Sequence, residues 1–338
     1  MRGALMPKVY AAPAAVMAML MVSGCGGGHA TYVPPGDGDA DGDGDEASCV
    51  NECPASGATR CVGNTVETCT GDEAGCLLWE ASVDCREGSG VCGYEGGGAA
   101  CIACERGTLE GDYEITDEES LAGLAGYTRV TGTVTVDATH LSSLVGLECL
   151  QEVGALRIHN NDSLTSLDGL DSLTSVVGTR PELPGSLHIE GNASLTSLAG
   201  LESLTGVRYV RIVDNDALTS LAGLENITSV VGGVTIEDND VLTSLAGLDN
   251  ITTISHGLDI VENDALTSLA GLENLTSVVC LNIADNDSLT SLDGLESLTS
   301  VDNHLAIEDN DALTSLAGLE NITSVDGSLG ISDNDALT

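Results

Sequence analysis

The sequence predicts a mainly β protein: a β-solenoid with one short strand in each coil, preceded by a small disulfide-rich module. Three observations predict this fold. One motif recurs to the last residue, each copy opens with strand-like alternation of apolar and polar residues, and nine cysteines gather ahead of the repeats. A fixed period of 23 or 24 residues is typical of stacked coils rather than of a single globular core.

The repeats align on one asparagine. Successive copies are separated by 31, 23, 24, 24, 23, 24 and 24 residues, and two degenerate copies precede them near 113–115 and 133–136, so we expect about ten coils within residues 111–338. The aligned residues are Asn161, Asn192, Asn215, Asn239, Asn263, Asn286, Asn310 and Asn334.

Each copy predicts a strand, a turn and an irregular return. Val234 and Ile236 alternate with polar residues, which indicates a strand with one buried face. Apolar residues then recur at every third position from Leu242 to Ile254, with poor helix formers between them. One such coil cannot bury its apolar edge, but ten coils at about 4.8 Å per step form a continuous column roughly 45 to 50 Å long.

The aligned asparagine follows the strand closely. Asn239 comes three residues after Ile236, and the other copies keep this spacing. We expect each of these side chains to turn inward and bond the backbone of the turn in the next coil. The ladder is therefore structural rather than catalytic.

The string LxIxxNxxLxxLxGLxxIxxV, as it begins at Leu258 and Ile260, resembles the receptor L domain, the leucine-rich-repeat-like solenoid of insulin-receptor and EGF-receptor ectodomains. The resemblance covers residues 111–338. It departs from ordinary leucine-rich repeats because two residues separate the Asn from the next Leu. The resemblance implies recognition of proteins or other ligands on an exposed sheet, but a fold does not determine the partner.

The first 48 residues predict export and a tether. Residues 1–24 carry early positive charges and an apolar run, as in a signal peptide too short to span a membrane. Val22-Ser23-Gly24-Cys25 resembles a bacterial lipobox, which implies cleavage before Cys25 and a lipid anchor on its thiol; an ordinary secretory signal is the alternative. The Asp/Gly-rich residues 25–48 predict a disordered spacer, although part of the run matches a calcium loop.

Residues 49–104 hold nine cysteines, a density that indicates a disulfide-stapled module in an exported protein. Nine is an odd number, so Cys149 could supply the missing partner from the solenoid, since it lies five coils from Cys280 and cannot reach it. A zinc site at Cys101 and Cys104 is the alternative. The nine cysteines are Cys49, Cys53, Cys61, Cys69, Cys76, Cys85, Cys92, Cys101 and Cys104.

Composition excludes some functions. A formal net charge of −43 argues against nucleic acid as a partner. The six histidines show no metal-binding spacing, Ser recurs only as a turn residue, and no Gly-rich phosphate loop opens a helix, so we predict a protein that is not an enzyme and has no catalytic residues.

Four of the five arginines in residues 111–338 lie in coils three to five. Arg157, His188 and Arg211 are expected to share one outward column, beside an insertion at 179–185. Insertions in solenoids often lie on the binding face, so we predict a site for an anionic or carboxylate-bearing ligand. The alternative is that these arginines only offset nearby acidic residues. The predicted ligand-binding residues are Arg157, His159, Arg180, His188, Arg208, Tyr209 and Arg211.

Two acidic columns flank the asparagine ladder, and neighbours about 4.8 Å apart would repel by roughly 0.9 kcal/mol per contact in bulk water. Side chains that fan into solvent, salt screening and Asp bonds to turn amides would relieve this repulsion. The alternative is calcium bridging adjacent carboxylates, with Asp238, Asp240, Asp264, Asp285 and Asp287 as ligands. No other cofactor is predicted.

These patterns predict a non-enzymatic lipoprotein of the bacterial cell envelope, in the outer membrane or at the cell surface, that recognises a protein or polysaccharide through the exposed solenoid face. The alternative is a passive acidic coat or spacer protein. The last repeat breaks off at Thr338, which predicts either a truncated fragment or an end covered by another copy.

Overall fold

The computed structural model describes residues 56, 58–62, 65–71, 77–85, 90–95, 98–137, 140–178 and 185–338. The predicted signal peptide, Cys25, the tether and Arg180 lie outside these residues. Among the described residues, no helix is long and apolar enough to cross a membrane.

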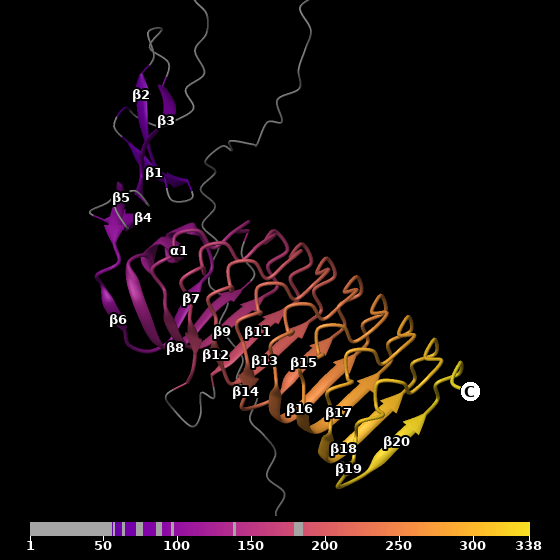
Figure 1. Ribbon diagram of the computed structural model, residues 1–338. Coiled ribbons are helices and arrows are strands. Elements are labelled where there is room, and N and C mark those ends of the chain that lie inside the picture. The colour runs from indigo at the N-terminus through magenta and orange to yellow at the C-terminus, as the bar shows by residue number, and fades with distance from the viewer. Residues whose placement is uncertain are drawn as a thin grey trace, which may run out of the picture. The chain divides into compact units, whose positions relative to one another are not determined.

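The predicted β-solenoid is confirmed. Ten strands pair in parallel, one per coil, so that they bound nine full turns of about 24 residues (Figure 1). The pairing is in register with the repeat: Val234 lies opposite Val210 on one side and Leu258 on the other. The ten strands are β7 (Tyr113–Ile115), β8 (Tyr127–Asp137), β9 (Glu152–His159), β11 (Ser186–Glu190), β13 (Tyr209–Val213), β15 (Val234–Glu237), β16 (Thr253–Val261), β17 (Ser277–Ala284), β18 (Ser300–Glu308) and β20 (Leu329–Ser332).

The structure adds a second short strand segment at the end of the return, which the sequence analysis did not anticipate. It consists of a Ser-Val pair or its equivalent, and Val230 pairs with Ile254 of the next coil. In the longer strands, such as β16 and β17, this segment continues into the main strand across a register shift. The separate segments are β6 (Gly107–Leu109), β10 (Ser175–Val176), β12 (Gly206–Val207), β14 (Ser229–Val230) and β19 (Ser324–Val325).

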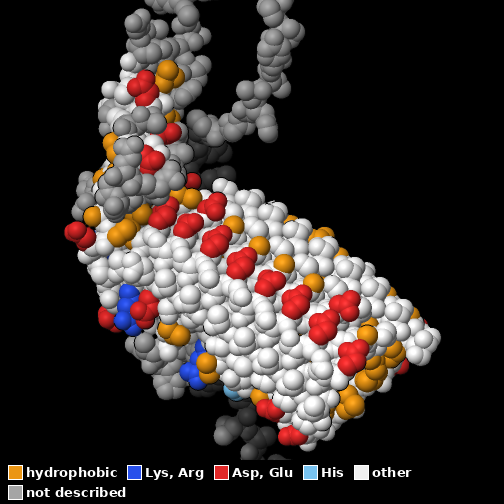
Figure 2. All heavy atoms as spheres, in the orientation of Figure 1, with side chains coloured by type: hydrophobic (Ala, Val, Ile, Leu, Met, Phe, Trp, Pro, Cys, Tyr) orange, Lys and Arg blue, Asp and Glu red, His pale blue; other side chains and the backbone are white. Residues whose placement is uncertain are grey.

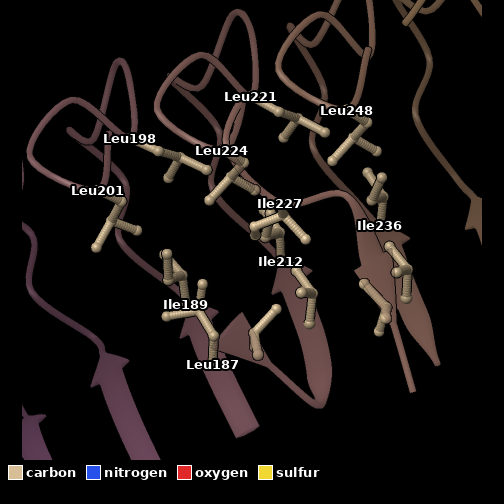
Figure 3. Packing of buried hydrophobic residues seen from close by; sticks show 14 of the residues in the cluster. Leu187, Ile189, Leu198, Leu201, Ile212, Leu221, Leu224, Ile227, Ile236 and Leu248 are labelled. Carbon is tan, nitrogen blue, oxygen red and sulfur yellow. The ribbon is translucent and has the colours of Figure 1, made fainter. Parts of the chain in front are cut away.

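The core is one aliphatic column that runs through the stack. Strand residues such as Ile212 and Ile236 meet Leu221, Leu224 and Ile227 of the return, and all five side chains are fully buried (Figure 3). Every third return residue therefore points inward, as the spacing predicts. Stacking removes from water an apolar edge that a single coil would expose.

The asparagine ladder lies inside the stack. The Nδ2 of Asn263 donates to the carbonyl of Ile236 in the preceding coil at 3.0 Å and to that of Val261 in its own strand at 2.9 Å. Its Oδ1 accepts from the backbone N–H and the Nδ2 of Asn239, at 3.3 and 3.2 Å. The inward position was predicted correctly, but the prediction that each side chain bonds the backbone of the next coil was wrong, because the backbone partners belong to the preceding coil and to the residue's own strand.

A second repeated feature is a glycine turn in the return segment of each coil. Gly247 adopts a φ of 113°, and a Cβ there would lie 2.1 Å from the carbonyl oxygen of Leu221 in the preceding coil. Its N–H donates to the carboxylate of Asp249 at 2.7 Å. The same Gly-to-carboxylate bond recurs in the other coils, so these turns require a glycine followed two residues later by an acid.

The cysteine-rich part consists of β1 (Thr59–Val62), β2 (Thr65–Gly71) and β3 (Leu77–Asp84) in one antiparallel sheet, with β4 (Gly90–Glu95) and β5 (Gly98–Ala103) as a hairpin. Cys85 is bonded to Cys101, and Cys104 to Cys149. The prediction that Cys149 supplies a partner from the solenoid is confirmed. The alternative zinc site is wrong, because both of its sulfurs are in disulfides.

The two ends of the solenoid differ. Near the N-terminal end lies the capped helix α1 (Glu118–Gly123), with Leu121 buried, and a cluster formed by Val91, Ile102, Ala125 and Cys149. At β20, in contrast, Leu329 and Ile331 are 59% and 38% exposed and border an open apolar hollow. The prediction that the chain is a truncated fragment, or that another copy covers this exposed surface, stays a prediction.

Candidate ligand-binding site

Three basic side chains form a stack on the outer face of the sheet. His188 of β11 lies directly opposite Arg157 of β9 and Arg211 of β13 in the parallel register. The alternate residues of these strands, such as Leu187 and Ile189, are fully buried. The predicted outward column is therefore present, because side chains in a strand alternate between the two faces.

This stack borders a shallow depression of about 450 Å³. Ser186 pairs with Tyr209 in the sheet, and the register of the next two strands places Gly233 and Gly257 in the same column. The hollow forms here because these two glycines have no side chains. The depression is lined by Arg157, Ser186, His188, Tyr209, Val210, Arg211, Gly233, Thr235, His256, Gly257 and Asp259.

Tyr209 is held by backbone packing at the edge of the hollow. A Cβ on Gly232 would lie 2.4 Å from the Tyr209 ring, so the ring rests directly against the glycine backbone. The ring centroids of Tyr209 and His256 are 6.3 Å apart, with the planes tilted by 53°. The Nδ1 of His256 is 3.0 Å from the carbonyl oxygen of Val231, which fixes this second ring. Two neighbouring aromatic rings therefore lie against the glycine-rich part of the lining.

The two arginines have different surroundings. Arg211 forms ion pairs with two carboxylates: its Nε is 3.8 Å from Oε2 of Glu190, and its Nη1 is 3.4 Å from Oε2 of Glu237. Arg157 is exposed and forms no ion pair with any residue in the described part of the chain. The alternative that arginines only offset acidic neighbours therefore describes Arg211, whereas Arg157 keeps a guanidinium that can bind an external anion.

Two titratable groups in the depression have shifted pKa values. Burial, followed by the positive charges of Arg157, His159 and Arg211, lowers the pKa of His188 from 6.5, while Glu190 acts in the opposite direction. Burial also raises the pKa of Asp259 from 3.8, against a hydrogen bond from Asn282 that lowers it. His188 is thus a neutral hydrogen-bonding group at pH 7.

Not every predicted site residue belongs to the depression. Of the predicted ligand-binding residues, Arg157, His188, Tyr209 and Arg211 line it. His159 lies beside Glu190 in the adjoining column, and its buried Nε2 has no hydrogen-bond partner in the described structure. Arg208 is exposed in the turn before β13, outside the lining, and Arg180 is not described.

Sequence reasoning missed the C-terminal half of the depression. Thr235 and Asp259 continue the column of Arg211, and Gly233 continues the column of Tyr209. The same register argument could have found all three residues. His256 gave no such signal, because it lies at the register shift within β16, where alternation no longer predicts direction.

The acidic columns lie on the surface beside the asparagine ladder. The residue before each Asn, such as Asp238, adopts a left-handed φ of about 55° and is exposed. Burial and then the neighbouring carboxylates, first Asp214 and Asp240, raise the pKa of Asp238 from 3.8. The pKa values of Asp264 and Asp309 are raised for the same reasons. Stacked carboxylates therefore repel one another in the folded chain.

The carboxylates that bond turn amides belong to a different column from the one predicted. The residues two positions after the turn glycines, such as Glu225 and Asp249, accept those bonds. The described residues include no group of three or more His, Cys, Asp or Glu side chains arranged to hold a metal ion. Figure 2 shows a row of acidic side chains along the stack, while the cationic side chains on that face lie toward its N-terminal coils.

No protein-family model matches the sequence, and no curated protein matches it. The receptor L domain resemblance therefore stays a prediction, and the site must be interpreted from its own geometry.

Proposed function

We propose that this chain is a non-enzymatic, lipid-anchored recognition protein of the bacterial cell surface, similar to receptor L domains, and that it binds an anionic ligand in the depression around Arg157. One observation carries the proposal. A guanidinium with no ion pair among the described residues, a neutral imidazole and two neighbouring aromatic rings line one hollow on a protein of net charge −43. Ligand sites commonly combine a concave surface with a few convergent polar groups.

The rest of the chain supports display rather than catalysis. The repeats form an aliphatic stack whose core lies inside the coils, which leaves the outer face of the sheet to present polar side chains. The sequence ahead of the stack predicts export, lipid attachment at Cys25 and a spacer. Such an arrangement would hold the sheet face away from a membrane and in reach of a protein or polysaccharide.

The test is binding of the full chain to a panel of cell-envelope polysaccharides and secreted proteins, for wild type and Arg157→Gln. We expect the variant to lose at least tenfold in affinity for the bound member, with a stronger loss at low salt. Arg129→Gln is the matched control, because Arg129 pairs with Glu152 at 3.1 Å outside the depression. A passive acidic coat is the better description if Arg157→Gln changes no binding in the panel.

The anchor has its own test. Cys25→Ser should abolish incorporation of labelled palmitate and leave the precursor uncleaved by the lipoprotein peptidase. Palmitate labelling that persists in the variant would refute the lipid anchor, without bearing on the depression.

A further inference from the structure

We propose that the depression selects a saccharide unit with a single carboxylate, such as a uronic acid, rather than a polyanion. This inference rests on the proposed function and names the ligand class of the same site. It is carried by the number and pairing of the charges around the hollow, together with the placement of its rings.

The charges at the depression leave room for one anionic group. Arg157 and Arg211 are the arginines of the lining and Asp259 is its carboxylate, while Glu190 and Glu237 lie beside the lining and pair with Arg211. Arg211 is already paired with both glutamates, so the guanidinium of Arg157 is the cation left for a ligand. A densely charged sulfated or phosphorylated chain would place its further charges near these carboxylates on a protein of net charge −43, where like charges repel.

The same carboxylates suit a ligand rich in hydroxyl groups. Asp259 lines the depression and is partly exposed, and its carboxylate oxygens accept hydrogen bonds, as sugar hydroxyls require; Glu190 and Glu237 add acceptors beside the lining, next to Arg211. The neutral imidazole of His188 adds a group that can both donate and accept. A ligand with one carboxylate and several hydroxyl donors therefore matches the depression better than one with several charges.

The rings and glycines supply the shape. Tyr209 lies beside Gly233 and Gly257 in the lining, and the His256 ring lies next to it at a tilt, with 6.3 Å between the ring centroids. Aromatic side chains with a polar tip bury large contact area while keeping a hydrogen-bonding group in water. A flat, partly apolar pyranose face fits against such a ring, whereas an extended peptide backbone would gain little from it.

The test is calorimetric titration of the full chain with four probes. They are a trisaccharide with one terminal glucuronic acid, the same trisaccharide with its carboxyl reduced to the alcohol, a heparin-type sulfated oligosaccharide, and a tripeptide with a free C-terminal carboxylate. We expect the glucuronic acid probe to bind, the reduced probe to lose at least tenfold in affinity, and the sulfated probe to bind no more tightly than the reduced one.

Variants identify the groups involved. Arg157→Gln should remove the difference between the acidic and the reduced trisaccharide, and Tyr209→Leu should weaken both trisaccharides, while Arg129→Gln should change neither. Because Arg157 is exposed, its variant should fold as wild type, which a thermal melt checks.

Each contrary outcome has a separate meaning. Tighter binding of the sulfated probe, or equal binding of the acidic and reduced trisaccharides, overturns the inference of a single-carboxylate site. Binding of the tripeptide alone, lost in Arg157→Gln, overturns the saccharide and leaves the proposed recognition function intact. Binding of no probe overturns the saccharide inference, and the proposed function then fails only if the panel of envelope components also shows no dependence on Arg157.

Discussion

The coils from β9 to β13 and those from β15 to β18 share one interior and have different exteriors. In both regions the strand contributes two buried apolar residues, such as Leu187 and Ile189 or Leu281 and Ile283, and the buried asparagine ladder runs through both without interruption. Outside, one column changes from Arg157, His188 and Arg211 to Thr235, Asp259, Asn282 and Ala306. Stability therefore depends on what the repeats share, and the proposed recognition on what they do not.

The largest expected effect breaks the shared interior. Asn263→Leu should destabilise the chain by roughly 3 to 6 kcal/mol. The variant leaves the carbonyl of Ile236 and the N–H of Asn239 buried without their hydrogen-bond partners, which costs about 1 to 3 kcal/mol per group. The larger leucine side chain adds strain. Asn192→Leu, within the cationic coils, should cost about the same. Denaturant melts of both variants measure this.

Unequal losses in the two asparagine variants would show that the interiors are not equivalent. Hydrogen exchange resolves the result by coil, since a solenoid opens in segments and need not unfold in one step. We expect the loss of protection to concentrate in the coils next to the changed residue.

A somewhat smaller effect follows from the turn glycines. Gly247→Ala forces a side chain into the left-handed region, at about 1 to 2 kcal/mol, and against the Leu221 carbonyl oxygen, at about 1 to 3 kcal/mol. Gly206→Ala is the control, because Gly206 has no positive φ and a Cβ there would lie no closer than 3.4 Å to Ser175. If both variants melt at the same temperature, the glycine turn is not under the constraint described.

The two regions should respond to pH in opposite directions. The folded chain binds protons at Asp238 and Asp264 more tightly than the unfolded chain does, so stability should rise as the pH falls toward 3.8. At His188 the unfolded chain binds the proton more tightly, so stability should fall as the pH drops below 6.5 toward the lower folded pKa. Melting temperatures measured between pH 4 and 8 report the sum of these two contributions to stability.

Variants separate the two contributions. His188→Asn should remove the loss below pH 6.5, and Asp238→Asn should raise the melting temperature at pH 7 while reducing the gain at low pH. The groups facing His188 are Arg157, His159, Arg211 and Glu190, so the Glu190→Gln variant should deepen the loss. An unchanged pH profile in His188→Asn would contradict the cause given for its pKa.

The smallest expected effect concerns salt and calcium along the acidic columns. Screening alone predicts a melting temperature that rises with ionic strength and is the same in millimolar calcium and in sodium chloride at matched ionic strength. Calcium bridging between residues such as Asp238 and Asp240 predicts a further rise in calcium, with saturable heat in calorimetry. Equal melting temperatures and no such heat would remove the calcium hypothesis.

Much of the fold could be predicted because each position of the repeat has the same structural role in every coil. The three-residue apolar spacing predicted the buried return, and the lone Asn predicted the ladder, since a polar residue inside an apolar column must find backbone partners. Cys149 could be assigned by distance along the stack. The direction of the ladder bonds could not be predicted, because it depends on side-chain orientation relative to coils above and below.

The candidate site was predicted only in part, for a physical reason. Charged side chains such as Arg157 stand out in sequence, but a hollow is formed by what is missing, here the side chains of Gly233 and Gly257. The pairing of Arg211 with Glu190 and Glu237 depends on which neighbours the guanidinium reaches, which alternation alone does not give. A charge pattern therefore locates the coils but not the free cation.

The Cys104–Cys149 bond gives the molecule a mechanical property. It closes a loop of 45 residues that contains β7 and most of the first two coils. A pulling force applied ahead of Cys104 passes through the disulfide and enters the stack at Cys149, next to β9, which carries Arg157. The enclosed residues, about 150 Å of chain if fully extended, cannot be drawn out while the bond is intact. Tension would thus reach the candidate binding coils directly and bypass the coils that precede them.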